Sequence, residues 1–374
     1  MDNSKNAAVP VKIELIDDFT GRIALTPAQF RKQISGKWQL EIDGVRHSFG
    51  QFLLRELPPG EPREILLSVE VPDAVFNAEA ILIIRLFDEN DLPITTAGFS
   101  MPVPAHLPPA APAAEYITGV RFDLSQAIIS SGKLSATINA DGIRELYYNG
   151  EKLLTCGPRL SLYRAGKTAG TLHSLQLDRL RISPDRFVSD GQSVESHALV
   201  LPSRMELDEL EFTQKFTPQN DGSIRYDAQF VVPESFSGIP RLGVVMRLPG
   251  NMEKVSCFGR QPVNSELPGA IKTLSHTTVS EVSRQYLDGG YYQEVKFVAL
   301  GDETGKQQLK IFSTGTPFSF TVMKFSENSI ADAAAAGKEL PAEESEVYLY
   351  IDCRNGDSQA VKAGVCRMTL FFTI

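Results

Sequence analysis

Residues 134–150, with the sequence LSATINADGIRELYYNG, give the clearest indication of the fold. The segment 134–138 is typical of a β-strand and leads into the dipeptide Asp141-Gly142. After a second strand-like segment, 143–148, the dipeptide Asn149-Gly150 follows. Both dipeptides favour the two-residue turns of β-hairpins, because their residues tolerate positive φ angles. Two such turns at this spacing predict an antiparallel β-meander.

Strand-like segments continue from this meander to the end of the sequence. They lie at residues 224–232, 243–248, 293–300, 309–313, 318–324, 347–352 and 367–373. One short helix is predicted around residues 329–336, where alanines favour a helix and Gly337 ends it. Strands that follow one another without an internal linker predict one large two-sheet sandwich. Because they do not alternate with long helices, no catalytic (β/α)₈ barrel is expected.

The first hundred residues also consist of short strand-like runs. Residues 11–16 alternate apolar and polar side chains, and residues 38–42 do the same before the turn dipeptide Asp43-Gly44. Runs at 64–69 and 80–87 raise the expected total to about seven strands. That number with short turns is typical of an immunoglobulin-like β-sandwich. The fold class is therefore predicted to be all-β.

A proline-rich segment separates the two regions. Five prolines stand within residues 102–112. Proline cannot donate to a sheet ladder and favours an extended spacer. We therefore predict a first domain over residues 1–104, a linker over 105–114 and a second domain over 115–374.

Charge and composition argue against several classes of function. The formal net charge of the 374 residues is −9, whereas nucleic-acid binding needs a clustered positive surface. No apolar run approaches the roughly 20 residues that span a bilayer. Residues 1–6 are polar and no apolar stretch of signal-peptide type follows. We expect a cytoplasmic protein with no nucleic-acid or membrane partner, and leave the periplasm open if the chain is a fragment.

The four cysteines do not form a metal or redox motif. Cys156, Cys257, Cys353 and Cys366 stand far apart and never as a C-x-x-C pair. We expect free cysteines that act as small buried hydrophobic residues. No metal and no cofactor is predicted.

Sequence signatures of catalysis are missing as well. There is no G-x-S-x-G, H-E-x-x-H, P-loop or G-x-G-x-x-G motif, and the histidines stand singly. Of these, His276 in a polar segment stays a remote site candidate. The acidic residues at 206–211 alternate with apolar ones, which favours a solvated strand face over a glycosidase pair. No catalytic residue is predicted.

Two adjacent tyrosine pairs could offer stacking surfaces for a sugar. In a strand, one member of Tyr147-Tyr148 and one member of Tyr291-Tyr292 should face away from the core. A partly buried structural tyrosine is the simpler interpretation at each single position.

Residues 240–262, with the sequence PRLGVVMRLPGNMEKVSCFGRQP, resemble a known motif. It is the P-R-x-G…L-P…V-x-W-Y-G-R-G-P segment in the C-terminal domain of glycoside hydrolase family 2 β-galactosidases. The segment 351–358 with the final strand, and the first domain with its hairpin at 38–44, are similar to the same enzymes. The resemblance thus extends over nearly the whole chain.

The resemblance implies a galactose mutarotase-like β-supersandwich for the second domain. It also implies a C-terminal portion or small subunit of a β-galactosidase-like glycosidase, with a catalytic barrel domain or large subunit as partner and a galactoside-type sugar. The catalytic glutamates of the family lie on that barrel and are not expected in this chain. The positions that the resemblance places near the sugar are Arg164, Arg260, Asn264 and Gln359.

Three departures from the family pattern favour a scaffold role or a different glycoside. Only Arg164-Ala165 survives from a W-R-A-P-T-D-N-D motif, and residues 263–268 lack the family's Glu and Tyr-x-Asp-Arg. Gln359 stands where many members have a tryptophan. Two alternatives stay open, a freestanding carbohydrate-binding module and a mutarotase-type epimerase, which would need a histidine and a carboxylate placed for acid–base work.

Overall fold

The computed structural model describes residues 10–71, 78–103, 118–123, 125–162, 181–201, 208–239, 241–262, 272–287, 291–338, 341–353 and 361–374. Almost all of the regular secondary structure in these residues is β-strand, which confirms the all-β class. The chain divides into two compact units, Met1–Ala110 with Val263–Leu274 and Ala111–Pro262 with Ser275–Ile374. The predicted linker at 105–114 lies outside the described residues, and the predicted domain boundaries stay predictions.

The first unit consists of two antiparallel sheets. The three-stranded sheet has the order β1-β2-β5, and its strands are β1 (Val11–Asp17), β2 (Arg22–Pro27) and β5 (Arg63–Leu66). The four-stranded sheet has the order β4-β3-β6-β7, and its strands are β3 (Arg31–Ile42), β4 (Val45–Leu57), β6 (Ala80–Phe87) and β7 (Pro93–Met101). Ile23, Leu40 and Leu82 are among the fully buried side chains of their common core. Asp43 and Gly44 form the predicted turn with φ angles of 49° and 82°.

The second unit begins with the predicted meander. It is a five-stranded sheet of order β12-β11-β10-β9-β8. Its strands are β8 (Thr118–Asp123), β9 (Gln126–Ser131), β10 (Leu134–Asn139), β11 (Gly142–Tyr148) and β12 (Glu151–Leu154). Asn149 and Gly150 have φ angles of 48° and 86°, so the turn between β11 and β12 forms as the dipeptide predicts.

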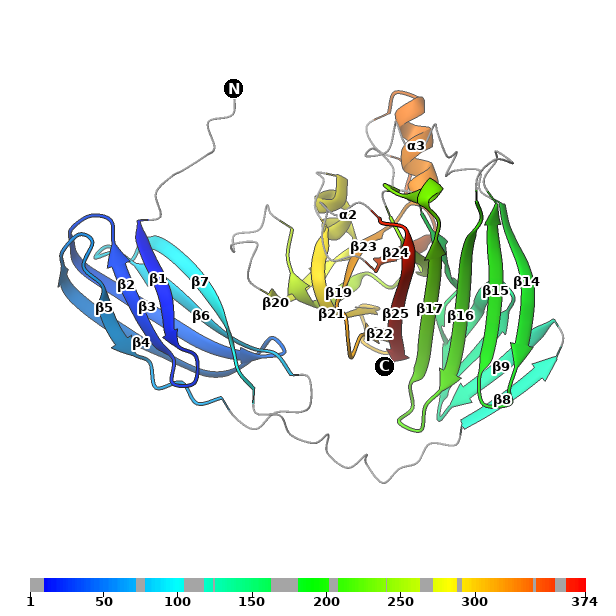
Figure 1. Ribbon diagram of the computed structural model, residues 1–374, viewed down its shortest axis with the longest axis horizontal. Coiled ribbons are helices and arrows are strands. Elements are labelled where there is room, and N and C mark those ends of the chain that lie inside the picture. The colour runs from blue at the N-terminus through cyan, green and yellow to red at the C-terminus, as the bar shows by residue number, and fades with distance from the viewer. Residues whose placement is uncertain are drawn as a thin grey trace. The chain divides into compact units, whose positions relative to one another are not determined.

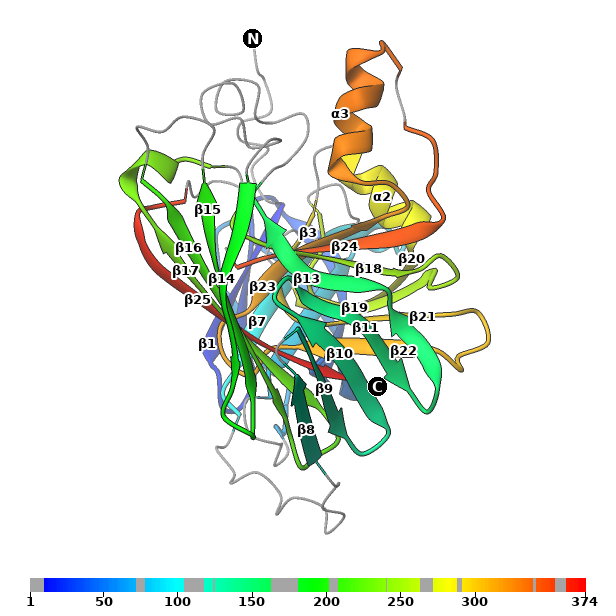
Figure 2. The ribbon, with the colours of Figure 1, turned by 90° about the vertical axis from the view of Figure 1, so that its right-hand side faces the viewer.

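The described strands that follow the meander form a 13-stranded sheet (Figures 1 and 2). Its main path is β13-β18-β24-β23-β21-β22-β25-β17-β16-β15-β14, with β19 paired to β20 and β21. The strands are β13 (Cys156–Ser161), β14 (Arg181–Ser189), β15 (Val194–Leu201), β16 (Leu210–Pro218), β17 (Ile224–Val232), β18 (Gly243–Pro249), β19 (Lys254–Arg260), β20 (Lys272–Thr278), β21 (Tyr292–Gly301), β22 (Gln308–Phe312), β23 (Phe318–Met323), β24 (Glu346–Asp352) and β25 (Gly364–Thr373). One core contains buried residues of both this sheet and the meander, so the two sheets pack as a sandwich.

Two α-helices lie in the described part of the second unit. The predicted helix is α3 (Glu327–Ala335), and Gly337 follows it with a φ of 69°. The helix α2 (Val279–Leu287) was not predicted. Its β-branched and serine residues lower helix propensity, but Thr278 caps it by accepting a hydrogen bond from the Glu281 N–H at 3.3 Å.

Candidate functional site

Of the four predicted sugar-contacting residues, only Arg260 lies in the described part of the chain. Arg164, Asn264 and Gln359 lie outside it. Arg260 is the last residue of β19, and its Nη2 lies 3.0 Å from Oε1 of Glu294. Their side chains are 35% and 29% exposed, so the pair lies at the surface.

A close approach of β19 and β21 places this arginine. The register between the two strands shifts between Phe258 and Arg260. A Cβ on Gly259 would lie 2.7 Å from Cγ2 of Val295, so only glycine fits between them. Glu294 has a φ of 49°, which a non-glycine residue rarely adopts. The Gly-Arg pair of the motif thus marks a bulged strand end that holds one guanidinium at the surface.

The first arginine of the motif has a different role. Arg241 is buried, and its Nη1 lies 2.8 Å from Oε1 of Glu327, with both side chains 5% exposed. The Arg241 guanidinium also stacks on the ring of Tyr350 at 4.5 Å, and the Tyr350 hydroxyl accepts a hydrogen bond from the Glu327 N–H. Because Glu327 is the first residue of α3, this ion pair fastens the helix to the sheet.

The glycine of the same motif is required by backbone packing. A Cβ on Gly243 would lie 1.9 Å from the carbonyl oxygen of Ile351 on the paired strand β24. Any larger residue would force the two strands apart. The motif at 240–262 therefore contains mainly packing residues, with Arg260 as its surface group.

Three hollows in the second unit share Arg159 as a lining residue. The first has a volume of about 300 Å³ and includes Glu327 and Tyr348 in its wall. The second, of about 450 Å³, is lined by Gln126, Thr137, Arg144, Glu145, Thr155, Cys156, Arg159 and Arg247. The third, of about 220 Å³, lies between β13 and the strands β14 to β16. We call the second hollow the arginine cavity.

Strand β13 contributes Cys156 and Arg159 to the wall of the arginine cavity. Gly157 has a φ of 105°, and a Cβ there would lie 2.5 Å from the carbonyl oxygen of Val245. The close packing of β13 on β18 pairs Cys156 with Arg247 across the ladder and Arg159 with Val245. The Cys156 side chain raises the pKa of Arg247, with a further contribution from Glu346.

Two carboxylates beside these hollows, those of Glu145 and Glu346, are paired with cations. Glu145 lies 2.6 Å from Nζ of Lys152, and this hydrogen bond lowers the pKa of Glu145. Glu346 accepts hydrogen bonds from Arg247 at 3.0 Å and from Thr155 at 2.5 Å. Glycoside hydrolysis needs one carboxyl group that stays neutral as the acid, and an ion-paired carboxylate is unsuited to that role. Glu145 and Glu346 are therefore poorly suited to act as such an acid.

The tyrosine pairs differ in their surroundings. Tyr147 and Tyr148 are half-buried, and Nζ of Lys152 lies 5.4 Å from the Tyr147 ring centroid. Tyr291 and Tyr292 are both buried, so the expectation that one of them faces outward is wrong. Tyr292 stacks on Phe320 in the main core, whereas Tyr291 precedes the strand and packs into a separate small cluster. They are structural residues.

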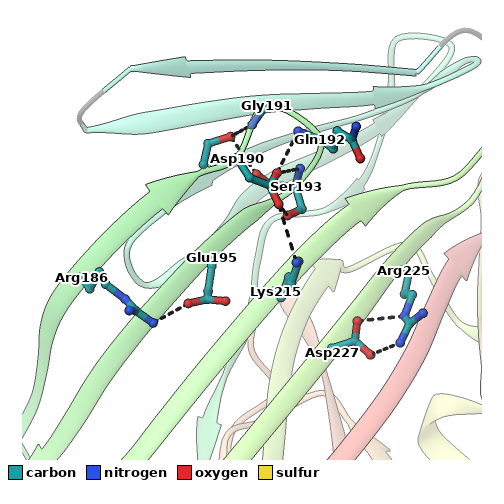
Figure 3. A network of polar contacts seen from close by, with 10 residues as sticks. Arg186, Asp190, Gly191, Gln192, Ser193, Glu195, Lys215, Arg225 and Asp227 are labelled. Atoms are coloured by element: carbon teal, nitrogen blue, oxygen red, sulfur yellow. Dashed lines mark hydrogen bonds and ion pairs between the residues drawn. The ribbon is translucent and has the colours of Figure 1, made fainter.

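A polar ladder covers the outer face of β14 to β17 (Figure 3). Arg186 pairs with Glu195 at 2.5 Å, and Arg225 with Asp227 at 2.8 Å. Sequence analysis missed that His197 belongs here, with its Nδ1 2.5 Å from Oδ1 of Asp185. The alternation of Glu195 and His197 with the small or apolar residues beside them was the sequence signal that could have placed it on an outer strand face. Glu211 is exposed on the neighbouring strand, which agrees with a solvated face for the described part of 206–211.

His276 and the four cysteines lie apart from the three hollows, except for Cys156. His276 is exposed, and its Nδ1 lies 2.9 Å from Oγ of Ser256. Cys156 and Cys257 are buried as expected, but Cys353 and Cys366 are partly exposed, so the expectation of burial is wrong for them. Among the described residues no group of three or more side chains could hold a metal ion. No helix of the described part is long and apolar enough to cross a bilayer.

The second unit is thus a β-sandwich with a polar hollow and with Arg260 at the surface end of β19. The model of the family described as beta galactosidase small chain matches residues 135–357. That span is more than half of the sequence, and the chain belongs to this family. The resemblance drawn from residues 240–262 is thereby confirmed.

Two further comparisons complete the picture. No curated protein matches this chain. Among solved structures, a galactose 1-epimerase from Lactobacillus acidophilus NCFM is similar with a TM-score of 0.34 and 8% identity. The alignment covers 69% of this chain and 98% of the epimerase.

Proposed function

We propose that this chain is the non-catalytic part of a β-galactosidase-like glycoside hydrolase, which packs on a catalytic barrel and shapes the mouth of the sugar site. Membership of the small chain family carries the proposal, since a small chain implies a larger catalytic partner. The ion-paired state of Glu145, Glu327 and Glu346 supports the non-catalytic part of it. Hydrolysis then depends on carboxylates that the partner supplies.

An exposed apolar stripe in the first unit supports docking to a partner. Strand β4 lies at the edge of its sheet, and Phe49 and Leu53 on it are 71% and 50% exposed. Large apolar side chains on an open sheet edge favour association with another protein. We assign this stripe to the barrel contact.

Arg260 is the residue that we assign to the sugar-site mouth. Glu294 fixes its guanidinium, and its Nε is buried without a hydrogen-bond partner among the described residues. A fixed guanidinium donates well to the hydroxyl groups of a sugar. Such a group contributes to substrate binding without taking part in bond cleavage.

Purification of the native protein from its source cells tests the docking proposal. We expect the chain to copurify with a larger barrel-containing protein, and the pair to hydrolyse a chromogenic β-galactoside that the chain alone leaves intact. Phe49→Lys with Leu53→Lys should weaken the association, whereas Leu92→Lys, at an exposed turn, should not. Hydrolysis by the chain alone would refute the non-catalytic role. A lone chain that binds lactose would favour the carbohydrate-binding module instead.

A second experiment tests Arg260 in the assembled enzyme. Arg260→Ala should raise KM for the galactoside roughly tenfold, the loss expected for one charged hydrogen bond. Arg225→Ala is the matched control, because Arg225 is also held by a neighbouring carboxylate but lies on the outer polar ladder. An unchanged KM for Arg260→Ala would remove this residue from the sugar site.

A further inference from the structure

Among the described residues, the arginine cavity is lined by more cationic than anionic side chains. Arg144 on β11, Arg159 on β13 and Arg247 on β18 all line it. Arg247 is matched by Glu346, and Glu145 is matched by Lys152. Arg144 and Arg159 are exposed, and neither forms an ion pair within 4.0 Å in the described part of the chain, although the charge of Arg144 also helps to lower the pKa of Glu145. The cavity is thus cationic in a protein of net charge −9.

The remaining wall of the cavity is polar and uncharged. Gln126 and Thr137 line it beside the arginines. An amide and a hydroxyl both donate and accept hydrogen bonds, which suits the hydroxyl groups of a sugar ring. A volume of about 450 Å³ lies in the range of small-molecule sites and accommodates a monosaccharide unit.

We propose that the arginine cavity binds an acidic saccharide through its carboxylate. Guanidinium groups bind carboxylates through two parallel hydrogen bonds, which gives this pairing both strength and direction. Arg144 and Arg159 take the carboxylate, while Gln126 and Thr137 contact the ring hydroxyls. The sugar class extends the proposed function, but the binding itself belongs to this chain and needs no partner.

Calorimetry on the purified full chain tests the site with galacturonate, galactose and sulfate as probes. We expect galacturonate to bind, and Arg159→Ala and Arg144→Ala each to weaken it roughly tenfold or more. Arg225→Ala should leave binding unchanged, and circular dichroism verifies that each variant is folded. Equal binding of galactose, equal binding of sulfate, or arginine variants that bind normally would each overturn the proposal. Failure of the barrel partnership appears in copurification instead, so the two failures are distinguishable.

A second inference rests on a separate pair of side chains. Cys353 follows β24 and Cys366 lies on β25, and their Sγ atoms are 3.1 Å apart. Both residues are partly exposed and pack against the main core, and the Cys353 thiol also lies 2.8 Å from the Leu242 carbonyl oxygen. Burial raises the pKa of Cys257, the thiol of which is accordingly unreactive.

We infer that Cys353 and Cys366 form a disulfide when they meet a low-molecular-weight disulfide such as oxidised glutathione. One thiolate attacks the glutathione disulfide and releases one reduced glutathione. The second thiolate attacks the resulting mixed disulfide and releases the other. The protein thereby loses two thiol protons and two electrons. The two reduced glutathione molecules that are released contain these protons and electrons.

Thiol titration of the oxidised, denatured chain tests this inference. Of the four cysteines, two should remain reactive, and a peptide map should join residues 353 and 366. Cys353→Ser and Cys366→Ser should each abolish the cross-link, whereas Cys156→Ser should not. Four reactive thiols after oxidation, a persistent glutathione adduct, or a cross-linked dimer would overturn the inference.

Discussion

Replacing one partner of the buried Arg241–Glu327 ion pair should strongly destabilise the second unit. Each side chain is 5% exposed, and the guanidinium also stacks on Tyr350. Arg241→Met leaves the Glu327 carboxylate buried without its cation, and Glu327→Gln leaves the guanidinium without its anion. Removing one partner of a buried pair typically costs about 3–5 kcal/mol. At roughly 2–4 °C per kcal/mol for a unit of this size, the expected fall in Tm is roughly 6–20 °C.

The double variant Arg241→Met with Glu327→Met distinguishes a buried pair from simple loss of packing. Because this variant removes both charges of the pair, neither is left buried without the other, so its stability should return toward that of the original chain. Arg225→Met provides the exposed control, since its pair with Asp227 is 46% and 29% exposed and should contribute about 0–1 kcal/mol.

Denaturant unfolding followed by far-ultraviolet circular dichroism measures these differences. Trp38 is the only tryptophan of the sequence, so its fluorescence reports separately on the first unit. Single variants no less stable than the Arg225→Met control would refute the reasoning. A double variant that loses the sum of the two single effects would refute it as well.

Three further predictions concern single positions. Gly243→Ala should destabilise the second unit by at least the overpacking cost of about 1–3 kcal/mol. Gly315→Ala, where a Cβ meets open space, should change Tm little, and equal Tm values for the two variants would contradict the prediction. The N–H groups of residues 192 and 193 lower the pKa of Asp190 to about 2, so its stabilising contribution is complete above about 4 and lost as pH falls to about 2. The stability of Asp190→Asn should therefore fall less between pH 4 and pH 2 than that of the original chain. An NMR titration midpoint near 4 for the Asp190 carboxyl of the folded original chain would contradict the lowered pKa. Burial raises the pKa of Glu41, so the folded state loses stability as pH rises above the ordinary glutamate pKa of about 4.3. Glu41→Gln should therefore raise the stability of the first unit at pH 7, measured by Trp38 fluorescence, and a decrease in stability would contradict the raised pKa.

The parts of the fold that depend on local chemistry were predictable from the sequence. The dipeptides Asp43-Gly44 and Asn149-Gly150 form the turns that their tolerance of positive φ predicts. The strand predicted at 224–232 coincides with β17, because its side chains alternate between core and solvent. The helix α2 was missed because its capping signal spans only four residues.

The parts that depend on distant strands were not predictable. Arg144, Arg159 and Arg247 line one cavity only because β11, β13 and β18 meet, and no spacing in the sequence encodes that meeting. Arg260 was found through a family resemblance, since an arginine after a glycine carries no signal of its own. The closeness of Cys353 and Cys366 likewise requires knowledge of how the sheet is assembled.

The position of β25 has a consequence for biosynthesis. This last strand in sequence lies between β22 and β17, where it joins the two halves of the 13-stranded sheet. During translation every other strand of the sheet leaves the ribosome before it. Until β25 arrives, β17 and β22 present open edges that can pair with other chains. The nascent protein should therefore depend on chaperones until β25 has been made, and a chain truncated just before Gly364 should aggregate.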